Sequence, residues 1–119
     1  MWSAVVHTEL TWEDTKRHID IVFEMAQKYD APIDLHADFS DEASDQRFAS
    51  AAYVAQKTID TGYQGRVSLG HVTSLGSLDP DELKPVIELL RKADISIVTL
   101  PATDLYLGGR NDAKTVDVV

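Results

Sequence analysis

The segment Ile33-Asp34-Leu35-His36-Ala37 alternates apolar and polar side chains, and turn-forming residues flank it on both sides. Such alternation is typical of a short β-strand with one buried face. Three other segments are also rich in strand-forming residues, namely Ala4–His7, Val67–Val72 and Ile95–Leu100. The four predicted strands begin about 30 residues apart, which leaves room for one helix between each pair.

The first two intervals carry helical patterns. Thr11 is followed three residues later by Asp14, which predicts a capped helix start. Apolar residues then repeat at helical spacing, and Asp30-Ala31-Pro32 predicts the end of this helix. A second helix is predicted from about Asp45 to Gly62, because glycine suits the position just after a helix.

The third helix is predicted from the segment Asp79-Pro80-Asp81-Glu82, which places an acidic cap before a proline in the first turn. Pro85 inside the same pattern removes a backbone hydrogen bond. The sequence therefore also allows a helix that begins at Lys84, after a separate short turn.

Strands that alternate with helices predict an α/β fold with a parallel sheet and right-handed crossovers. A complete TIM (β/α)₈ barrel takes ~250 residues, or roughly 31 for each βα unit. The chain has 119 residues, so it holds just under four such units and is expected to form one domain over residues 1–119. Half a barrel requires strands in sequential order with the helices on one side. A reversed strand order would instead indicate a small, doubly wound open sheet.

Composition narrows the classes of function. The chain has 11 Lys+Arg against 20 Asp+Glu, a formal net charge of −9, which argues against a nucleic-acid or anionic-membrane surface. No apolar run is long enough for a transmembrane helix, no leader peptide is visible, and the cytoplasm is the expected compartment. Because the sequence has no cysteine, any metal ion must be bound by His, Asp or Glu.

Two histidines are the strongest candidates for chemistry. His36 lies near the end of the second predicted strand, and His71 lies near the end of the third. Ligands of parallel α/β folds bind at the carboxyl edge of the sheet, where neighbouring strands are about 4.8 Å apart. We therefore expect the two imidazoles to converge on one metal ion or one small substrate. The alternative is that each is a hydrogen-bonded core residue.

Other polar residues follow the same strand ends. Asp38 shares a face with His36 and is a candidate metal ligand, partner of an imidazole or substrate anchor; alternatively, it only starts a turn. His7 lies at the end of the first strand by the same logic, with less support because that strand can fray. Thr73 and Ser74 follow His71 and are expected to be ordinary loop residues.

An ordered set of motifs resembles a known family. The set is His36-Ala37-Asp38, then Gly65-Arg66-Val67, then Gly70-His71-Val72-Thr73-Ser74, and finally Pro101 through Leu107-Gly108-Gly109-Arg110. In order and spacing it resembles cytosine deaminase and its relatives in the amidohydrolase superfamily of metal-dependent hydrolases.

The resemblance implies a (β/α)₈ barrel with a divalent metal ion, zinc or iron, at its carboxyl mouth. On this map the four strands are barrel strands four to seven. His36 matches the metal-binding histidine after strand five, and His71 matches the histidine after strand six that lies near metal and substrate. His71 and Asp38 are then the expected catalytic and substrate-binding residues.

The chain departs from the complete family pattern in several places. It has no His-x-His pair, which the family carries after its first strand, and it ends before the aspartate that follows strand eight. It therefore resembles an internal fragment. Phe39 replaces the glutamate that shuttles protons in cytosine deaminases, and Asp104 replaces an asparagine common in the loop after strand seven. These changes weaken the inference of cytosine deamination and leave other C–N hydrolysis open.

The resulting interpretation is a fragment of a metal-dependent hydrolase that acts on non-peptide C–N bonds of a heterocyclic or amide substrate. As an isolated chain it is expected to be inactive, and its open sheet edges should lead it to oligomerise or to recruit the rest of the barrel. One alternative is a non-catalytic α/β module that binds a small ligand or a partner chain. Another is a flavodoxin-like domain, although the sequence has no phosphate-binding loop.

Overall fold

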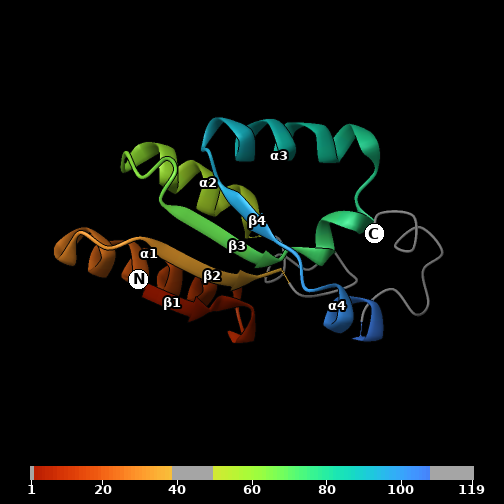
Figure 1. The fold of residues 1–119 in the computed structure, drawn as a ribbon, viewed down its shortest axis with the longest axis horizontal. Coiled ribbons are helices and arrows are strands. Elements are labelled where there is room, and N and C mark those ends of the chain that lie inside the picture. The colour runs from red at the N-terminus through yellow and green to blue at the C-terminus, as the bar shows by residue number, and fades with distance from the viewer. Residues whose placement is uncertain (1, 39–49, 108–119) are drawn as a thin grey trace.

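The computed structural model describes residues 2–38 and 50–107 of the chain (Figure 1). Strands and helices alternate along it, with short 3₁₀ turns after two of the strands. In chain order the elements are β1 (Trp2–Val5), η1 (Val6–Thr8), α1 (Trp12–Tyr29), β2 (Ile33–Ala37), α2 (Ala51–Asp60), β3 (Val67–His71), η3 (Thr73–Ser77), α3 (Pro80–Lys92), β4 (Ser96–Val98) and α4 (Pro101–Leu107).

The four strands form one parallel sheet in the order β1-β2-β3-β4. Ile33 of β2 pairs with Trp2 of β1 and with Val67 of β3, so the strands begin at a common level. This sequential parallel order confirms the predicted α/β architecture. It excludes the reversed strand order that a doubly wound sheet would show among the described strands.

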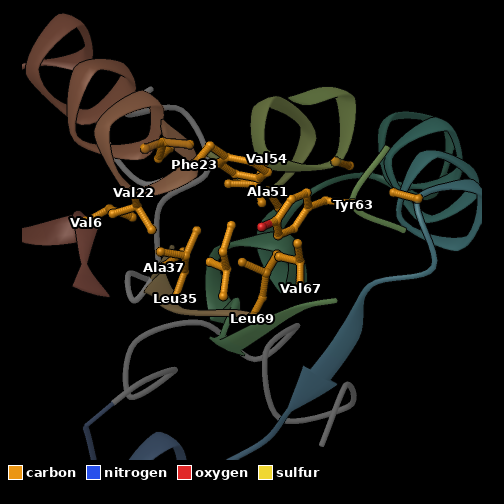
Figure 2. Close-up of a cluster of buried hydrophobic side chains, with 14 of the residues drawn as sticks. Val6, Val22, Phe23, Leu35, Ala37, Ala51, Val54, Tyr63, Val67 and Leu69 are labelled. Atoms are coloured by element: carbon orange, nitrogen blue, oxygen red, sulfur yellow. The ribbon is translucent and has the colours of Figure 1, made fainter. Parts of the chain in front are cut away.

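The helices α1, α2 and α3 lie over one face of the sheet, and the hydrophobic core fills the space between them and the strands (Figure 2). Leu35 and Leu69 point from the two central strands into this core, where they meet Phe23 of α1 and Val54 of α2. All four side chains are fully buried. Helices on one side, over strands in sequence order, are the arrangement expected for an arc of a barrel.

The helix caps follow the sequence signals. Thr11 precedes α1, and its hydroxyl accepts a hydrogen bond from the backbone N–H of Asp14 at 3.1 Å. Asp30 ends α1 in the left-handed conformation, with φ of 50°. Gly62 follows α2 with φ of 70°, as predicted for the position just after a helix. The predicted start of this second helix near Asp45 lies outside the described residues.

The third helix runs without interruption from Pro80 to Lys92, so the alternative start at Lys84 is wrong. The N–H of Asp79 donates to a carboxylate oxygen of Glu82 at 3.3 Å, and this reciprocal cap fixes the first turn ahead of Pro85. Pro85 lies on the exposed side of the helix. Its missing hydrogen bond therefore costs little, since the carbonyl it leaves unpaired can bind water.

Three segments differ from the sequence prediction. β1 ends at Val5, because the next three residues form the 3₁₀ turn η1 that contains His7. β4 is only Ser96–Val98, and all three residues are exposed at the edge of the sheet. The segment after β4, expected to be a loop, begins as the helix α4. The glycines and arginine at positions 108–110, and Phe39, lie outside the described residues.

Within residues 2–38 and 50–107, no helix lies over the second face of the sheet (Figure 1). Asp34 and His36 of β2, and Ser68 and Gly70 of β3, alternate with the buried core residues and belong to this face. We call it the open face. Within the described ranges, no helix combines the length and the apolar character needed to cross a membrane.

Candidate metal and substrate site

The imidazoles of His36 and His71 meet at the carboxyl end of the two central strands. Nδ1 of His36 lies 3.2 Å from Nε2 of His71, and the ring centroids are 5.2 Å apart. One of these nitrogens donates and the other accepts, depending on the tautomers. The structure thus brings together the two histidines that the sequence placed on adjacent strand ends.

Strand alternation alone does not explain this convergence. His36 pairs in register with Gly70, whereas His71 pairs with Ala37, whose side chain is buried on the helix side. Regular alternation would therefore turn His36 and His71 to opposite faces of the sheet. His71 instead has φ of 71°, in the left-handed region, and this backbone conformation accompanies its contact with His36.

The strain continues into the next residue. Val72 has φ of 55°, which is rare for a β-branched side chain because Cβ crowds the backbone. The position is held from two directions: the side chain is 6% exposed, and the Val72 N–H donates to the carbonyl of Ala37 at 3.1 Å. Sparsely populated conformations of this kind cost about 1–3 kcal/mol each and persist only when the surroundings enforce them.

Gly70 provides the surface beneath His36. A Cβ atom at this glycine would lie 3.6 Å from Nδ1 of His36, at ordinary van der Waals contact. A methyl group would therefore fit, but a branched side chain would displace the imidazole. The Gly-His sequence of β3 thus matches the ring that stacks over it from the neighbouring strand.

His7 is the third imidazole of the site. Its Nδ1 lies 3.2 Å from the carbonyl oxygen of His36, and its ring meets that of His71 edge-on, with centroids 6.2 Å apart. Burial lowers the pKa of His7, and the nearby imidazoles act in the same direction, while the bond to the His36 carbonyl opposes them. Sequence reasoning gave this residue less weight because the first strand could fray, and it did not predict the turn η1, which holds His7 at the end of β2.

Asp38 occupies a different place from the imidazoles. It is fully buried with φ of 54°, and its carboxylate accepts from the N–H and hydroxyl of Ser50, at 2.6 and 2.7 Å, and from the N–H of Ala51 at 2.8 Å. Burial raises the pKa of Asp38 to about 6, although the three donors favour the ionised form. The carboxylate therefore anchors the start of α2.

The backbone of Asp38 joins this anchor to the turn after β3. Its carbonyl oxygen accepts from the N–H of Ser74 at 3.1 Å and from the hydroxyl of Thr73 at 3.4 Å. Ser74 is buried, so the two residues expected to be plain loop residues instead tie η3 to the end of β2. Asp38 thus connects β2, α2 and η3, the elements that surround His36 and His71.

The spacing of the two central imidazoles fits a shared ion. Zinc–nitrogen bonds of about 2.0–2.1 Å at tetrahedral angles separate two ligand nitrogens by about 3.3–3.4 Å. The observed separation of His36 and His71 nitrogens is 3.2 Å. Over residues 2–38 and 50–107, the structure shows no group of three or more His, Asp or Glu side chains arranged to hold a metal ion.

Two proteins with related sequences are a pterin deaminase and an amidohydrolase. A pterin deaminase from Rhizobium rhizogenes (strain K84 / ATCC BAA-868) is 32% identical over 102 residues, which cover 86% of this chain and 23% of that protein. An N-isopropylammelide isopropyl amidohydrolase from Pseudomonas sp. (strain ADP) is 31% identical over 68% of this chain and 19% of its own length. The chain thus spans about a quarter or less of these relatives.

Solved structures share the fold. A 5-methylcytosine deaminase from Klebsiella pneumoniae, liganded with 5-fluorocytosine, matches with a TM-score of 0.84 and 22% identity, over 93% of this chain and 26% of that one. The N-isopropylammelide isopropylaminohydrolase of Burkholderia multivorans ATCC 17616 matches with a TM-score of 0.69 and 23% identity, over 82% of this chain and 24% of that one. The sequence model of the amidohydrolase family matches residues 2–117. The chain therefore belongs to the amidohydrolase family, as its motifs had indicated.

Proposed function

We propose that this chain is a fragment of a metal-dependent hydrolase that acts on non-peptide C–N bonds, as a deaminase or a hydrolase of cyclic amides or amidines. The convergence of His36 and His71 at the carboxyl edge of a parallel sheet carries the proposal. The fold match to a quarter of the 5-methylcytosine deaminase supports a partial barrel, and we assign the four strands to barrel strands four to seven.

Amidohydrolases are typically metal-dependent, and the residues present fit part of a metal site. We propose that His36 binds a divalent ion, zinc or iron. When bound, such an ion supplies a water molecule whose pKa is lowered to near neutrality. Because two imidazoles are fewer than the three or four protein ligands of zinc sites, the remaining ligands are expected from other parts of a complete barrel.

We propose that His71 is the catalytic residue of the fragment that contacts the substrate. Its ring lies beside His36, where it can hydrogen-bond to a heterocyclic or amide group and stabilise charge that develops on it. Asp38 then serves the site by holding the elements around the imidazoles, since its own carboxylate is engaged by the start of α2. A direct contact between Asp38 and substrate would require those hydrogen bonds to break.

The alternative is a non-catalytic α/β module that binds a small ligand or a partner chain. The exposed edge strand β4 favours a partner, since all three of its residues are exposed and a half barrel leaves its edges open. The partner that suits a partial barrel with open edges is the remainder of the barrel. The two hypotheses differ in whether His36 matters for turnover.

A chimera tests the hydrolase proposal. In the chimera, residues 1–119 of this chain replace the matching segment of the Rhizobium rhizogenes pterin deaminase. Release of ammonia is measured with pterin and cytosine, and release of the alkylamine is measured with an N-alkylated ammelide. We expect a zinc-loaded chimera to turn over one of these compounds, and His36→Ala to lower kcat/KM more than about 100-fold, because a metal ligand matters more than its supporting residues. His18→Ala, on α1, is the matched control. Equal turnover by the His36→Ala chimera would refute the metal role.

A further inference from the structure

The three histidines His7, His36 and His71 form what we call the imidazole cluster. They come from three consecutive strand ends: β1 through η1, then β2, then β3. The centroid of His71 lies 5.2 Å from that of His36 and 6.2 Å from that of His7. His7 thus takes part in the geometry of the site, although nothing in the metal or substrate roles described above uses it.

The hydrogen bond between His7 and the end of β2 determines which ring nitrogen of His7 carries a proton. The carbonyl oxygen of His36 can only accept a hydrogen bond, so Nδ1 of His7, 3.2 Å away, must carry the proton. When the ring is neutral, Nε2 then carries the lone pair. The bond joins residues 29 positions apart in sequence and holds the backbone from which His36 extends.

The place of this hydrogen bond in the sheet explains why it can affect the position of His36. Val5 is the last residue of β1 in register with His36, and beyond it the chain leaves the strand in the turn η1. The regular ladder between β1 and β2 therefore stops at His36. The His7 side chain adds a hydrogen bond to the carbonyl of His36 at the point where the ladder ends.

We infer that His7 is a positioning residue of this site, which acts through its Nδ1–H on the carbonyl of His36 and so keeps the His36 ring against His71. The inference deepens the proposed function, because the position of His36 matters most where that ring holds an ion. It concerns the geometry of the metal-free chain as well, and it can therefore be tested separately from catalysis.

Two amide side chains separate the possible roles of His7. Asparagine places an N–H donor near the position of histidine Nδ1, whereas glutamine places its amide near the position of Nε2. His7→Asn should therefore keep the bond to the His36 carbonyl, and His7→Gln and His7→Ala should lose it. His18→Asn is the control for an imidazole outside the cluster: His18 lies on α1 and pairs at 2.9 Å with Glu9, the residue that ends η1, so this variant perturbs the end of the turn without removing the bond of His7 to His36.

The first readout is nitrogen-15 NMR of the imidazoles in the metal-free 119-residue chain. We expect the His36–His71 hydrogen-bond signature to persist in His7→Asn and in the control and to disappear in His7→Ala and His7→Gln. Far-UV circular dichroism should remain unchanged in all four. A His36–His71 signature that survives in His7→Ala, in a folded chain, would overturn the inference whatever the fate of the hydrolase proposal.

The second readout is zinc affinity by calorimetry on the same variants. We expect His7→Ala and His7→Gln to bind zinc about tenfold more weakly than the unsubstituted chain, as for other residues that support a ligand, and His7→Asn to remain within about twofold. If His7→Asn bound zinc as weakly as His7→Ala while His7→Gln bound it like the unsubstituted chain, His7 would act directly through its Nε2. That result would contradict a role through the carbonyl of His36.

Discussion

The two faces of the sheet are made by the same strands and have opposite character. On the helix side, Ile33, Leu35 and Leu69 are at most 1% exposed and sit in a continuous apolar core. On the open face, the register aligns Asp34 with Ser68 at one level and places His36 over Gly70 at the next. The helix side of β2 and β3 is buried by helices of this chain, whereas the open face of the same strands presents polar side chains.

This difference separates what holds the fragment together from what gives it chemistry. Residues on the helix side bury apolar area against α1 and α2, so their contribution to the free energy of unfolding is present in the fragment itself. The open-face hydrogen bond between the Ser68 hydroxyl and the Asp34 carboxylate, at 3.0 Å, is only partly buried. Substitutions on the two faces should therefore differ in kind as well as in size.

The largest predicted effect is on the helix side. Leu69→Ala removes a fully buried side chain at the centre of the core and should lower the free energy of unfolding by about 4 kcal/mol. Ser68→Ala, the adjacent residue on the open face, should lower it by less than about 1 kcal/mol. Urea denaturation of both variants measures the contrast. Similar losses for the two would show that the faces are not energetically distinct.

The second-largest effect is expected at Asp38, which connects the helix side of the sheet with the residues around His36 and His71. Asp38→Ala leaves three buried donors without their acceptor and should cost about 2–3 kcal/mol of unfolding free energy. Zinc affinity should fall as well, because the end of β2, two residues after His36, loses its anchor on the start of α2. Asp34→Ala, on the open face, is the control. An Asp38→Ala variant as stable as the unsubstituted chain would remove the anchoring role.

The pH dependence of stability sharpens the same comparison. The folded-state pKa of Asp38 is about 6, above its usual 3.8, so the folded chain binds a proton more tightly than the unfolded chain. The stability contribution of protonated Asp38 is present below the unfolded value and is lost as the pH rises through about 6. Relative to Asp38→Asn, the unsubstituted metal-free chain should thus lose stability across this window. If the difference in unfolding free energy between the unsubstituted chain and Asp38→Asn did not change with pH, the argument that burial raises the pKa of Asp38 would be contradicted.

Gly70 tests the open face by itself. Gly70→Ala places a methyl group in ordinary contact with His36 and should leave the His36–His71 hydrogen bond intact, whereas Gly70→Val should displace the ring. The change should appear in the imidazole NMR signals, with circular dichroism unaltered. Retention of the signals in Gly70→Val would mean that the ring of His36 does not depend on the space over this glycine.

The smallest effect should come from the surface. Arg66 and Asp30 pair at 2.8 Å, but Asp30 is highly exposed, and such pairs are worth about 0–1 kcal/mol. Asp30→Ser should shift the urea midpoint only slightly, and the shift should shrink further in high salt. A loss comparable to that of Leu69→Ala would contradict the assignment of stability to the core.

Local signals in the sequence were enough to predict the alternation of strands and helices, the parallel sheet and the helix caps, while they left the strand order open between half a barrel and a doubly wound sheet. The caps at Thr11 and Asp79 depend on residues only three positions apart, so nearby sequence determines them. The convergence of His36 and His71 was also expected, although it depends on a left-handed backbone at His71 that alternation does not reveal.

Long-range contacts explain what the sequence could not predict. The hydrogen bond of His7 to His36 spans 29 positions, and the buried cap of α2 by Asp38 spans 12. Neither leaves a local pattern, because the partners are brought together only by the sheet. The continuous third helix was uncertain for a different reason: the cost of Pro85 depends on whether its side of the helix faces water, which is a property of the fold.

Zinc titration followed by imidazole NMR tests the central claim most directly. The account predicts weak binding by the isolated chain, with the signals of His36 and His71 shifting together while that of His18 stays in place. His36→Ala should weaken the binding further, and no hydrolytic turnover should be measurable. If the unsubstituted chain and His36→Ala gave identical zinc titrations, or if the largest NMR shift occurred at His18, the assignment of the open face as part of a metal site would be contradicted.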